Sequence, residues 1–394
     1  MKHTMRGYAC TTLIAILTTL AGAVLVAGCG GSGSSSSESS ETTETTSKPP
    51  AEENSSEPAA DNTPEPAAGD EFPDYSDLQP PSFTAPKGTK IAFLMPETIV
   101  PLQQAIIEGA EAAAKREGVD LKVFDAGGYV NVNKQVGQME TAIGEGFDGI
   151  MMVPSSPAGL NAQIKAARSA GIAVTADLVP PESEEINFAL LGTSPEEGEI
   201  LTRKLAESIG EEGQIFVEYG GEGSTPNIYF GKGVTKALKE FPKIEVVAQE
   251  EFPAFNPSES QTATENAVAA HPEVKGVLTN STSLIPGVQR ALKTAGLESL
   301  PAVGLGPNTS AEIAEIQAGT TVAATTPPFF KSGELLTEWT LAIIAGHEPK
   351  EKFLPVPSMV FTPDNIEEGL SNEAMFQSLP PSLLGCGPGE SQEC

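Results

Sequence analysis

The chain has 394 residues, enough for two domains that each bury a core and for additional tails. It carries 53 acidic and 23 basic residues, and its formal net charge of −30 argues against a nucleic-acid partner, because phosphates require a basic surface. Three scattered histidines (His3, His271 and His347) and the absence of zinc-type Cys/His spacing predict neither a metal site nor a cofactor.

Residues 1–28 have the pattern of an export signal, with basic Lys2, His3 and Arg6 before an apolar stretch. The sequence Leu25-Val-Ala-Gly-Cys29 resembles the lipobox of bacterial lipoproteins. The resemblance implies cleavage before Cys29, lipid on its sulfur, and an extracytoplasmic protein anchored to the outer face of the cell membrane. A spanning helix is disfavoured, because threonines interrupt the apolar stretch and a span needs about 20 strongly apolar residues.

Two further segments lack the composition of a folded domain. Residues 29–86 are rich in Ser, Thr, Glu and Pro, so we expect a disordered tether that holds the folded part away from the membrane. Within it, Phe72, Tyr75, Leu78 and Phe83 are expected to dock loosely at the domain entrance. Residues 381–394 are expected to be a flexible tail, and whether Cys386 and Cys394 form a disulfide or stay free thiols is open.

From residue 90 onward, short apolar runs alternate with amphipathic helical segments. The expected strands are residues 90–95, 121–124, 149–153 and 172–176, and the expected helices are residues 102–116, 132–145 and 158–170. Strands that are apolar on both faces are typical of a parallel sheet covered by helices on both sides. Ligands of such sheets bind outside the carboxyl ends of the strands. These ends are residues 96–100, 126–129, 154–157 and 177–178.

The alternation resumes in the second half, after a fifth apolar run at residues 188–191. Ser194 and Pro195 predict the start of a helix, with Glu197 as capping-box partner. Later strands are expected at residues 214–218, 244–248, 276–278, 302–303, 321–325 and 356–361, and later helices at 227–240, 257–270, 285–295, 310–317 and 332–345. The pattern predicts an α/β protein with two doubly wound parallel-sheet domains, and Trp339 is expected in the core.

Several stretches, in their order and spacing, resemble the type I periplasmic binding proteins, in particular the ribose- and galactose-binding receptors of ABC importers. They include Lys90-Ile-Ala-Phe-Leu94, Gly146-Phe-Asp-Gly-Ile-Met-Met-Val-Pro154, Ala270-His-Pro-Glu-Val-Lys-Gly-Val277 and Arg290-Ala-Leu-Lys-Thr-Ala-Gly296. The resemblance covers residues 88–362 and implies two lobes joined by a hinge of three crossings, which fall near residues 191–194, 325–329 and 354–357. It assigns residues 87–192 plus 328–355 to an N-terminal lobe and residues 193–327 plus 356–380 to a C-terminal lobe. It also implies a small-molecule ligand delivered to an ABC permease, and we expect a monomer.

The departures from the family pattern bear on the ligand. Asp177 matches an aspartate that hydrogen-bonds sugar hydroxyls in the sugar-binding members of the family. Phe255 matches an aromatic residue that stacks on a sugar face there. Charged or polar hydroxyl-binding groups of the family are replaced by Leu178, Ile228, Gly306 and Pro328. The expected ligand-binding residues are Asp177, Phe255, Ile99, Tyr129, Tyr229, Asn280, Asn308 and Phe329. A site with fewer charged groups and more rings favours a ligand less hydroxylated than ribose or glucose.

Other functions were weighed against solute binding. An enzyme is not expected, because no Gly-x-Ser-x-Gly elbow, His-Glu-x-x-His pair or P-loop is present. A receptor that presents its ligand to a membrane sensor, or a binder of a small aromatic compound, remains open. A transcriptional regulator of the same fold is excluded by the export signal and by the absence of a helix-turn-helix.

Overall fold

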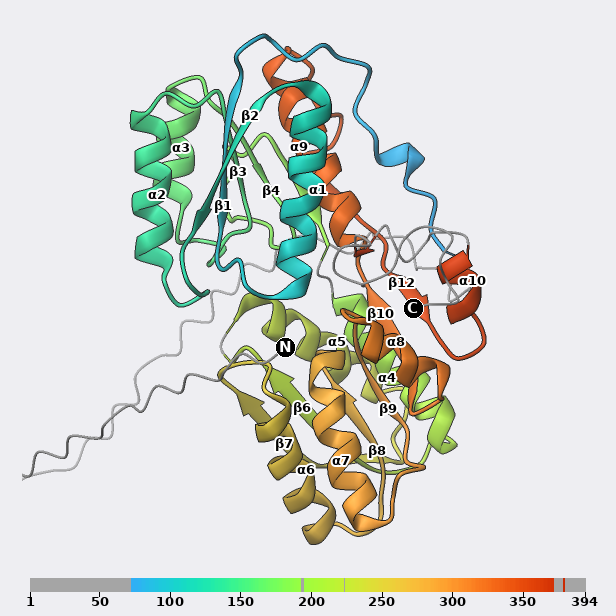
Figure 1. Ribbon diagram of the computed structural model, residues 1–394. Coiled ribbons are helices and arrows are strands. Elements are labelled where there is room, and N and C mark those ends of the chain that lie inside the picture. Colours follow the sequence, from blue (N-terminus) through green and yellow to red (C-terminus); the bar gives the residue numbers. More distant parts are fainter. Residues whose placement is uncertain (1–71, 193–194, 223, 372–377, 380–394) are drawn as a thin grey trace, which may run out of the picture. The chain divides into compact units, whose positions relative to one another are not determined.

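The computed structural model describes residues 72–192, 195–222, 224–371 and 378–379, which form two α/β lobes (Figure 1). Sheet A, in the N-lobe, has the strand order β11-β5-β4-β3-β1-β2, and sheet B, in the C-lobe, has the order β12-β10-β9-β8-β6-β7. The predicted fold class, two parallel-sheet α/β domains, is confirmed. Cys29, Cys386, Cys394 and the N-cap Ser194 lie outside the described residues.

The elements follow each other in regular alternation. The strands are β1 (Lys90–Met95), β2 (Asp120–Asp125), β3 (Gly149–Met152), β4 (Ala173–Ala176), β5 (Phe188–Leu191), β6 (Gly213–Gly220), β7 (Ile244–Phe252), β8 (Val274–Thr279), β9 (Ala302–Leu305), β10 (Thr321–Thr326), β11 (Phe353–Pro355) and β12 (Met359–Phe361). The α-helices are α1 (Pro101–Glu117), α2 (Val132–Gly144), α3 (Asn161–Ser169), α4 (Pro195–Ile209), α5 (Thr225–Leu238), α6 (Pro257–Ala270), α7 (Ile285–Ala295), α8 (Ser310–Gln317), α9 (Phe329–Ile344) and α10 (Ile366–Ser371). A short 3-10 helix at Ser76–Leu78 and another at Thr282–Leu284 complete the set in the described residues.

Each sheet buries both faces, as the apolar runs predict. Along β1, Ile91, Phe93 and Met95 point into the core beneath α1 and α9, whereas Ala92 and Leu94 point into the core beneath α2 and α3. This alternation follows from the two-residue period of a strand, and a run without polar residues is what two apolar faces require. In the C-lobe, α4 and α5 cover one face of sheet B and α6 and α7 the other.

The chain passes between the sheets three times. It leaves sheet A after Leu191, leaves sheet B after Thr326, and leaves sheet A again after Pro355. The strand expected over residues 356–361 is shorter in the structure, where β12 covers Met359–Phe361 and pairs antiparallel with β10 in sheet B. The third crossing, expected near residues 354–357, lies between this strand and β11 of sheet A. Pro355 and Pro357 lack a backbone N–H, so they favour a change of sheet here rather than one long strand.

In sequence, helix α9 follows β10 of the C-lobe, yet it packs on α1 in the N-lobe. The two helices approach at glycines: a Cβ at Gly333 would lie 2.0 Å from the carbonyl oxygen of Ile106, and one at Gly109 would lie 1.9 Å from that of Phe330. Only hydrogen fits at these two positions, so backbone packs directly on backbone. The C-lobe repeats the arrangement between α4 and α5 with Gly198 and Gly233.

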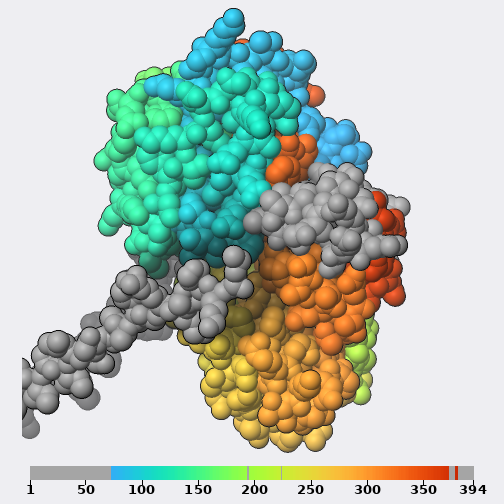
Figure 2. Space-filling view, in the orientation of Figure 1, coloured from blue at the N-terminus to red at the C-terminus, as the bar shows by residue number. Residues whose placement is uncertain are grey.

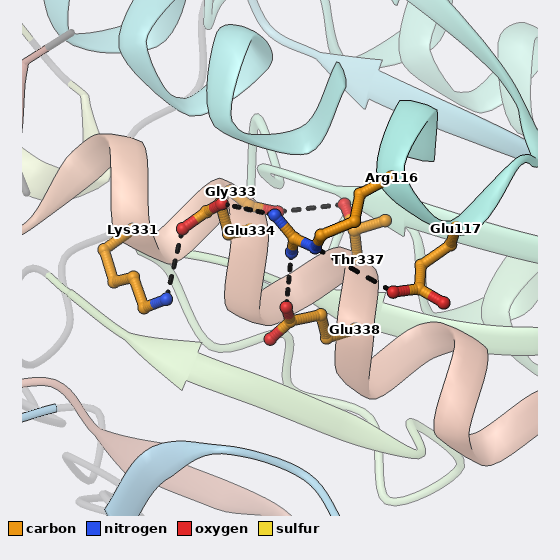
Figure 3. Close-up of polar contacts among 7 residues, drawn as sticks. All are labelled: Arg116, Glu117, Lys331, Gly333, Glu334, Thr337 and Glu338. Carbon is orange, nitrogen blue, oxygen red and sulfur yellow. Dashed lines mark hydrogen bonds and ion pairs between the residues drawn. The ribbon is translucent and has the colours of Figure 1, made fainter. Parts of the chain in front are cut away.

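An ion network fixes the register of α1 on α9 (Figure 3). The Arg116 guanidinium donates to Glu334 at 2.9 Å and to Glu338 at 2.5 Å, and the Lys331 Nζ lies 3.1 Å from Glu334. One arginine that bridges two carboxylates one helical turn apart holds α9 against both sliding and rotation. The same helix carries Ser332, which contacts the candidate site described next.

The structure corrects the expected extent of the tether. Residues 72–85 were assigned to the disordered tether, but Tyr75 is only 6% exposed and Phe72, Leu78, Phe83 and Ala85 pack against the core of the N-lobe and the hinge. These side chains give the segment enough apolar surface to offset the loss of chain entropy, which the Ser/Thr/Glu-rich part lacks.

Candidate functional site

In the N-lobe, the loops that follow β4, β3, β1 and β2 lie next to one another, because these strands are consecutive neighbours in sheet A. Asp177 follows β4, Ser155 follows β3, and Tyr129 lies in the loop after β2. Gln103 lies in the first turn of α1, which follows β1. The carboxyl end of this sheet therefore collects four polar side chains, and this is where ligands of open α/β sheets bind.

Asp177 is fully buried at this edge. Its Oδ1 accepts from the Leu178 amide at 2.8 Å and from the Ser332 hydroxyl of α9 at 3.5 Å, whereas its Oδ2 has no hydrogen-bond partner in the described residues. Burial raises the pKa of Asp177 to about 7, although both hydrogen bonds act in the opposite direction. A buried acceptor without a partner is costly unless a ligand or water supplies a donor.

The turn that presents Asp177 is strained. Leu178, the next residue, has a φ of +63°, which a branched side chain rarely adopts, and is itself buried. Such backbone strain is concentrated at functional sites because the surrounding structure has to hold it. The Leu178 side chain itself points into the core of the N-lobe.

Tyr129 lies close to Asp177. Its hydroxyl accepts from the Gln103 Nε2 at 3.2 Å. Burial raises the pKa of Tyr129 above its ordinary value, and the carboxylates of Glu97 and Asp177 add to the rise. Two more acceptors here have no partner in the described residues: the Oε1 of Gln103, a residue that is 1% exposed, and the Oγ of Ser155.

Sequence reasoning missed Gln103 and Ser155. A glutamine in the first turn of an amphipathic helix is usually exposed to solvent, and only the packing against Tyr129 reveals that Gln103 is buried. Ser155 could have been predicted as a site residue, because it belongs to the loop 154–157 that follows an apolar strand.

In the C-lobe, Phe255 lies after β7 and covers the end of β6. A Cβ at Gly220 would lie 2.4 Å from the Phe255 Cδ1, and one at Gly221 would lie 3.4 Å from its Cζ. The ring therefore rests on bare glycine backbone and remains partly exposed. A half-exposed aromatic face on a rigid support is suited to stacking against a ligand ring or an apolar sugar face.

Asn280 supports this platform rather than facing a ligand. Its Oδ1 accepts from the Gly220 amide at 2.8 Å, and its Nδ2 donates to the Gly220 carbonyl at 2.9 Å. The Nδ2 also lies 3.4 Å from the Asn227 Oδ1. Both ends of the Asn280 amide are thus occupied within the protein, which makes it a positioning residue for the backbone beneath Phe255.

Asn308 is held by its backbone N–H and by its side-chain Nδ2. Its amide N–H donates to the Glu312 Oε2 at 2.6 Å, and its Nδ2 lies 3.3 Å from the Thr282 Oγ1. Thr282 also contacts Glu312. A Cβ at Gly306 would lie 1.9 Å from the Thr282 Oγ1, so this backbone has no room for a side chain without movement of Thr282.

The other predicted site residues are scattered. Ile99 is 78% exposed in the loop before α1. Tyr229 lies on α5 with the Lys232 Nζ 5.1 Å from its ring centroid. Phe329, at the start of α9, is a core residue with 7% exposure. The structure therefore brings together Asp177 and Tyr129 in one lobe, and Phe255 and Asn280 in the other. Ile99, Tyr229 and Phe329 join neither group.

The remaining replaced positions are unsuited to binding hydroxyls. Ile228, on the first turn of α5, exposes 53% of an aliphatic side chain, and Pro328 immediately precedes α9. The N-lobe edge thus offers a few unpaired acceptors, whereas the C-lobe edge offers an aromatic face with its polar groups already paired. Among the described residues, no group of three His, Cys, Asp or Glu side chains is placed to hold a metal ion, and no helix is long and apolar enough to cross a membrane.

A hollow of about 440 Å³ lies elsewhere, between α5 and β7 of the C-lobe. Lys232, Lys236, Lys239 and Glu251 line it, together with the ring of Tyr219. None of the eight predicted ligand-binding residues belongs to its lining, although Asn227, which contacts Asn280, does.

Comparison with known proteins agrees with the fold. A family model described as a periplasmic binding protein domain matches residues 91–348. The xylitol-binding protein of Mycolicibacterium smegmatis is 27% identical over 199 residues, which cover 50% of this chain and 56% of that protein. The D-xylose-binding periplasmic protein of Escherichia coli is 25% identical over 264 residues, covering 64% and 80% of the two chains. The crystal structure of a sugar ABC transport substrate-binding protein from Bordetella parapertussis superimposes with a TM-score of 0.67 at 20% identity, covering 76% of this chain and 96% of the other.

Proposed function

This chain belongs to the periplasmic binding protein family, and we propose that it traps a small sugar-like ligand between its two lobes and delivers it to an ABC permease. Its place of action is extracytoplasmic, at the outer face of the membrane, through lipid on Cys29. The names of its relatives, which refer to xylitol and D-xylose, support a polyol or sugar ligand. The relatives are binding proteins, and we propose the same role here rather than catalysis.

The observation that carries the proposal is the unpaired Oδ2 of Asp177. A buried carboxyl group with a free oxygen is a strong acceptor for a ligand hydroxyl, and Gln103 and Ser155 add two more acceptors at the same sheet edge. These groups suit a ligand with a small number of hydroxyls on one side.

The finer proposal concerns the chemistry of the ligand. The positions that grip further hydroxyls in relatives carry Leu178, Ile228, Gly306 and Pro328, and each lost charge-assisted hydrogen bond costs roughly 1.5–3 kcal/mol. Two such losses weaken binding of a free pentose or hexose about a hundredfold or more. The Phe255 ring compensates by stacking, worth on the order of 1 kcal/mol beyond burial. We therefore propose a deoxy or substituted sugar, a polyol with an apolar face, or a small aromatic compound.

The test is a thermal-shift screen followed by calorimetry on the mature protein. The panel contains xylitol, D-xylose, D-ribose, 2-deoxy-D-ribose, D-glucose, D-galactose and phenyl glycosides, because a ligand that binds only the native state raises the melting temperature. With the best ligand, Phe255→Ala should weaken binding by about thirtyfold and Asp177→Asn by about fivefold.

Phe241→Ala provides the matched control, because this partly buried phenylalanine of the C-lobe lies before β7, at the opposite end of the sheet. The Phe241→Ala variant should bind the best ligand with the same affinity as the wild type. Submicromolar binding of unmodified ribose, galactose or glucose would refute the finer proposal. Failure of every sugar and polyol, with binding of an aromatic compound alone, would refute sugar binding itself.

A further inference from the structure

The segment before β1, residues 72–85, contacts both lobes and the hinge between them. It begins beside α10 of the C-lobe and runs along the N-lobe to the start of β1 (Figure 1). The space-filling view shows it, in blue, lying on the surface of the N-lobe (Figure 2). We call residues 72–85 the N-terminal strap.

The first contact is with the C-lobe. The Phe72 ring lies 5.3 Å, centroid to centroid, from the ring of Phe361 in β12. The two rings close over Gly369 of α10, where a Cβ would lie 2.6 Å from Phe361 and 2.9 Å from Phe72. Helix α10 is itself joined to α8 of the C-lobe through the hydrogen bond from Gln317 to Glu367 at 2.8 Å. Phe72 is therefore attached to the C-lobe.

The second contact is with the third crossing. Tyr75 is 6% exposed, and its hydroxyl donates to the carbonyl oxygen of Pro357 at 3.1 Å. Pro357 lies between β11 of one sheet and β12 of the other. The adjacent Val356 amide donates to the Leu191 carbonyl at 3.1 Å, which joins the third crossing to the first. Tyr75 thus binds the point where two crossings meet.

The third contact is with the N-lobe. The Trp339 Nε1 of α9 donates to the carbonyl oxygen of Leu78 at 2.8 Å. The Trp339 ring stacks on Phe188 of β5, with centroids 4.7 Å apart, so its position is fixed by the core. Between this bond and Tyr75, the strap forms a 3-10 turn in which the Asp74 carboxylate accepts from the Ser76 amide at 2.9 Å. The strap is short and structured between its attachments.

We propose that the N-terminal strap restrains the hinge, so that rotation of one lobe against the other has to break or stretch its contacts. Lobe closure in a two-lobe binding protein is absorbed by a few crossing residues. A segment fixed to the C-lobe at Phe72, to the third crossing at Tyr75 and to the N-lobe at Leu78 spans those residues in parallel with them. The C-terminal segment adds a contact at the second crossing, where the hydroxyls of Ser378 and Thr326 lie 2.6 Å apart.

The test compares amide hydrogen exchange in the ligand-free full-length mature protein, so its outcome does not depend on which ligand the protein binds. The variant Phe72→Ala with Tyr75→Phe removes the C-lobe contact and the bond to the crossing while it keeps a ring in the core. Exchange of the Val356 amide should become about tenfold faster, while amides of the central strands β3 and β8 keep their wild-type rates.

Ser76→Ala is the matched control, because Ser76 is an exposed strap residue whose side chain bonds only to Asp74 in the described structure. It should leave exchange at Val356 unchanged. If the double variant fails to fold, Tyr75→Phe alone should still make exchange of the Val356 amide several-fold faster. Unchanged exchange at Val356, in either variant that folds, would show that the strap is a passive cover and overturn the proposal.

Discussion

At the scale of single residues, Glu218 of β6 is a buried acid, and no positive charge lies beside it among the described residues. It is fully buried, and its carboxyl oxygens contact the hydroxyls of Ser260 at 2.5 Å and Thr264 at 2.8 Å. The Ser260 Oγ also lies 3.1 Å from the Leu284 carbonyl. Ser260 has one hydroxyl proton, so it satisfies both contacts only when Glu218 carries a proton of its own and donates it. Burial raises the pKa of Glu218 to about 7, in agreement with this arrangement.

This geometry predicts how stability changes with pH. A folded-state pKa above the unfolded value means that the native state binds the extra proton, so the contribution of Glu218 to stability is complete below about pH 4.5 and is lost as pH rises through about 7. Glu218→Gln keeps the neutral shape. Its free energy of unfolding should match that of the wild type at pH 5 and exceed it at pH 8 by on the order of 2 kcal/mol.

Denaturant unfolding at the two pH values measures this difference. Glu245→Gln, at an exposed position on the neighbouring edge strand β7, is the control and should give the same difference from wild type at both pH values. A Glu218→Gln variant that is less stable than wild type at pH 8 would contradict a neutral Glu218.

At the scale of elements, the contact between α1 and α9 depends on glycine. Gly333→Ala places a methyl group 2.0 Å from the Ile106 carbonyl oxygen, which the packed backbones cannot accommodate without moving apart. We expect a loss of about 3 kcal/mol in the free energy of unfolding. Gly137→Ala, in α2, is the matched control, because its Cβ meets open space; it should stabilise the protein by about 0.5–1 kcal/mol. Urea unfolding of both variants checks the sign of each change in the free energy of unfolding. A Gly333→Ala variant as stable as the wild type would mean that the helices are not in backbone contact.

Elements with clear end signals were predictable from the sequence. The expected helices 257–270, 285–295 and 310–317 coincide with α6, α7 and α8, where Asn256 and Thr309 cap the starts of α6 and α8 and Gly296 ends α7 in the left-handed conformation. The strand expected over residues 356–361 is shortened to Met359–Phe361, because Pro357 lacks a backbone N–H and cannot donate to a ladder, which periodicity alone does not show.

The site was less predictable than the fold. Position at a strand end selected Asn280 and Asn308 as ligand-binding residues, but both ends of the Asn280 amide contact Gly220 and the Asn308 Nδ2 contacts Thr282, partners that only the tertiary structure brings near. The sequence placed Ser155 in a strand-end loop and Gln103 on an amphipathic helix, but nothing in the local sequence of either shows a buried polar atom without a partner. Sequence patterns locate the strand ends, and packing decides which side chains there remain available.

At the scale of the whole molecule, we expect lipid on Cys29 to hold the protein at the membrane. Cys29→Ser removes the acceptor sulfur and should move the protein from the membrane fraction to the soluble fraction. Fractionation followed by immunoblotting measures this change. Cys10→Ser, in the apolar part of the export signal, is the control and should leave the protein in the membrane fraction. A Cys29→Ser protein that stays in the membrane fraction after a high-salt wash would contradict lipid anchoring.

The three crossings also determine the order in which the lobes are completed during translation. Residues 195–326 contain, without interruption, five of the six strands of sheet B and the helices on both its faces. The N-lobe starts to emerge from the ribosome first, but its sheet lacks β11 and the covering helix α9 until residues 329–355 have been made. Until then Met151 of β3 lacks the cover that Thr337 of α9 gives it, and apolar surface left uncovered in this way invites aggregation or chaperone binding. The lobe that begins the chain therefore completes its sheet only after most of the other lobe has been made, and only β12 and α10 of the C-lobe follow it.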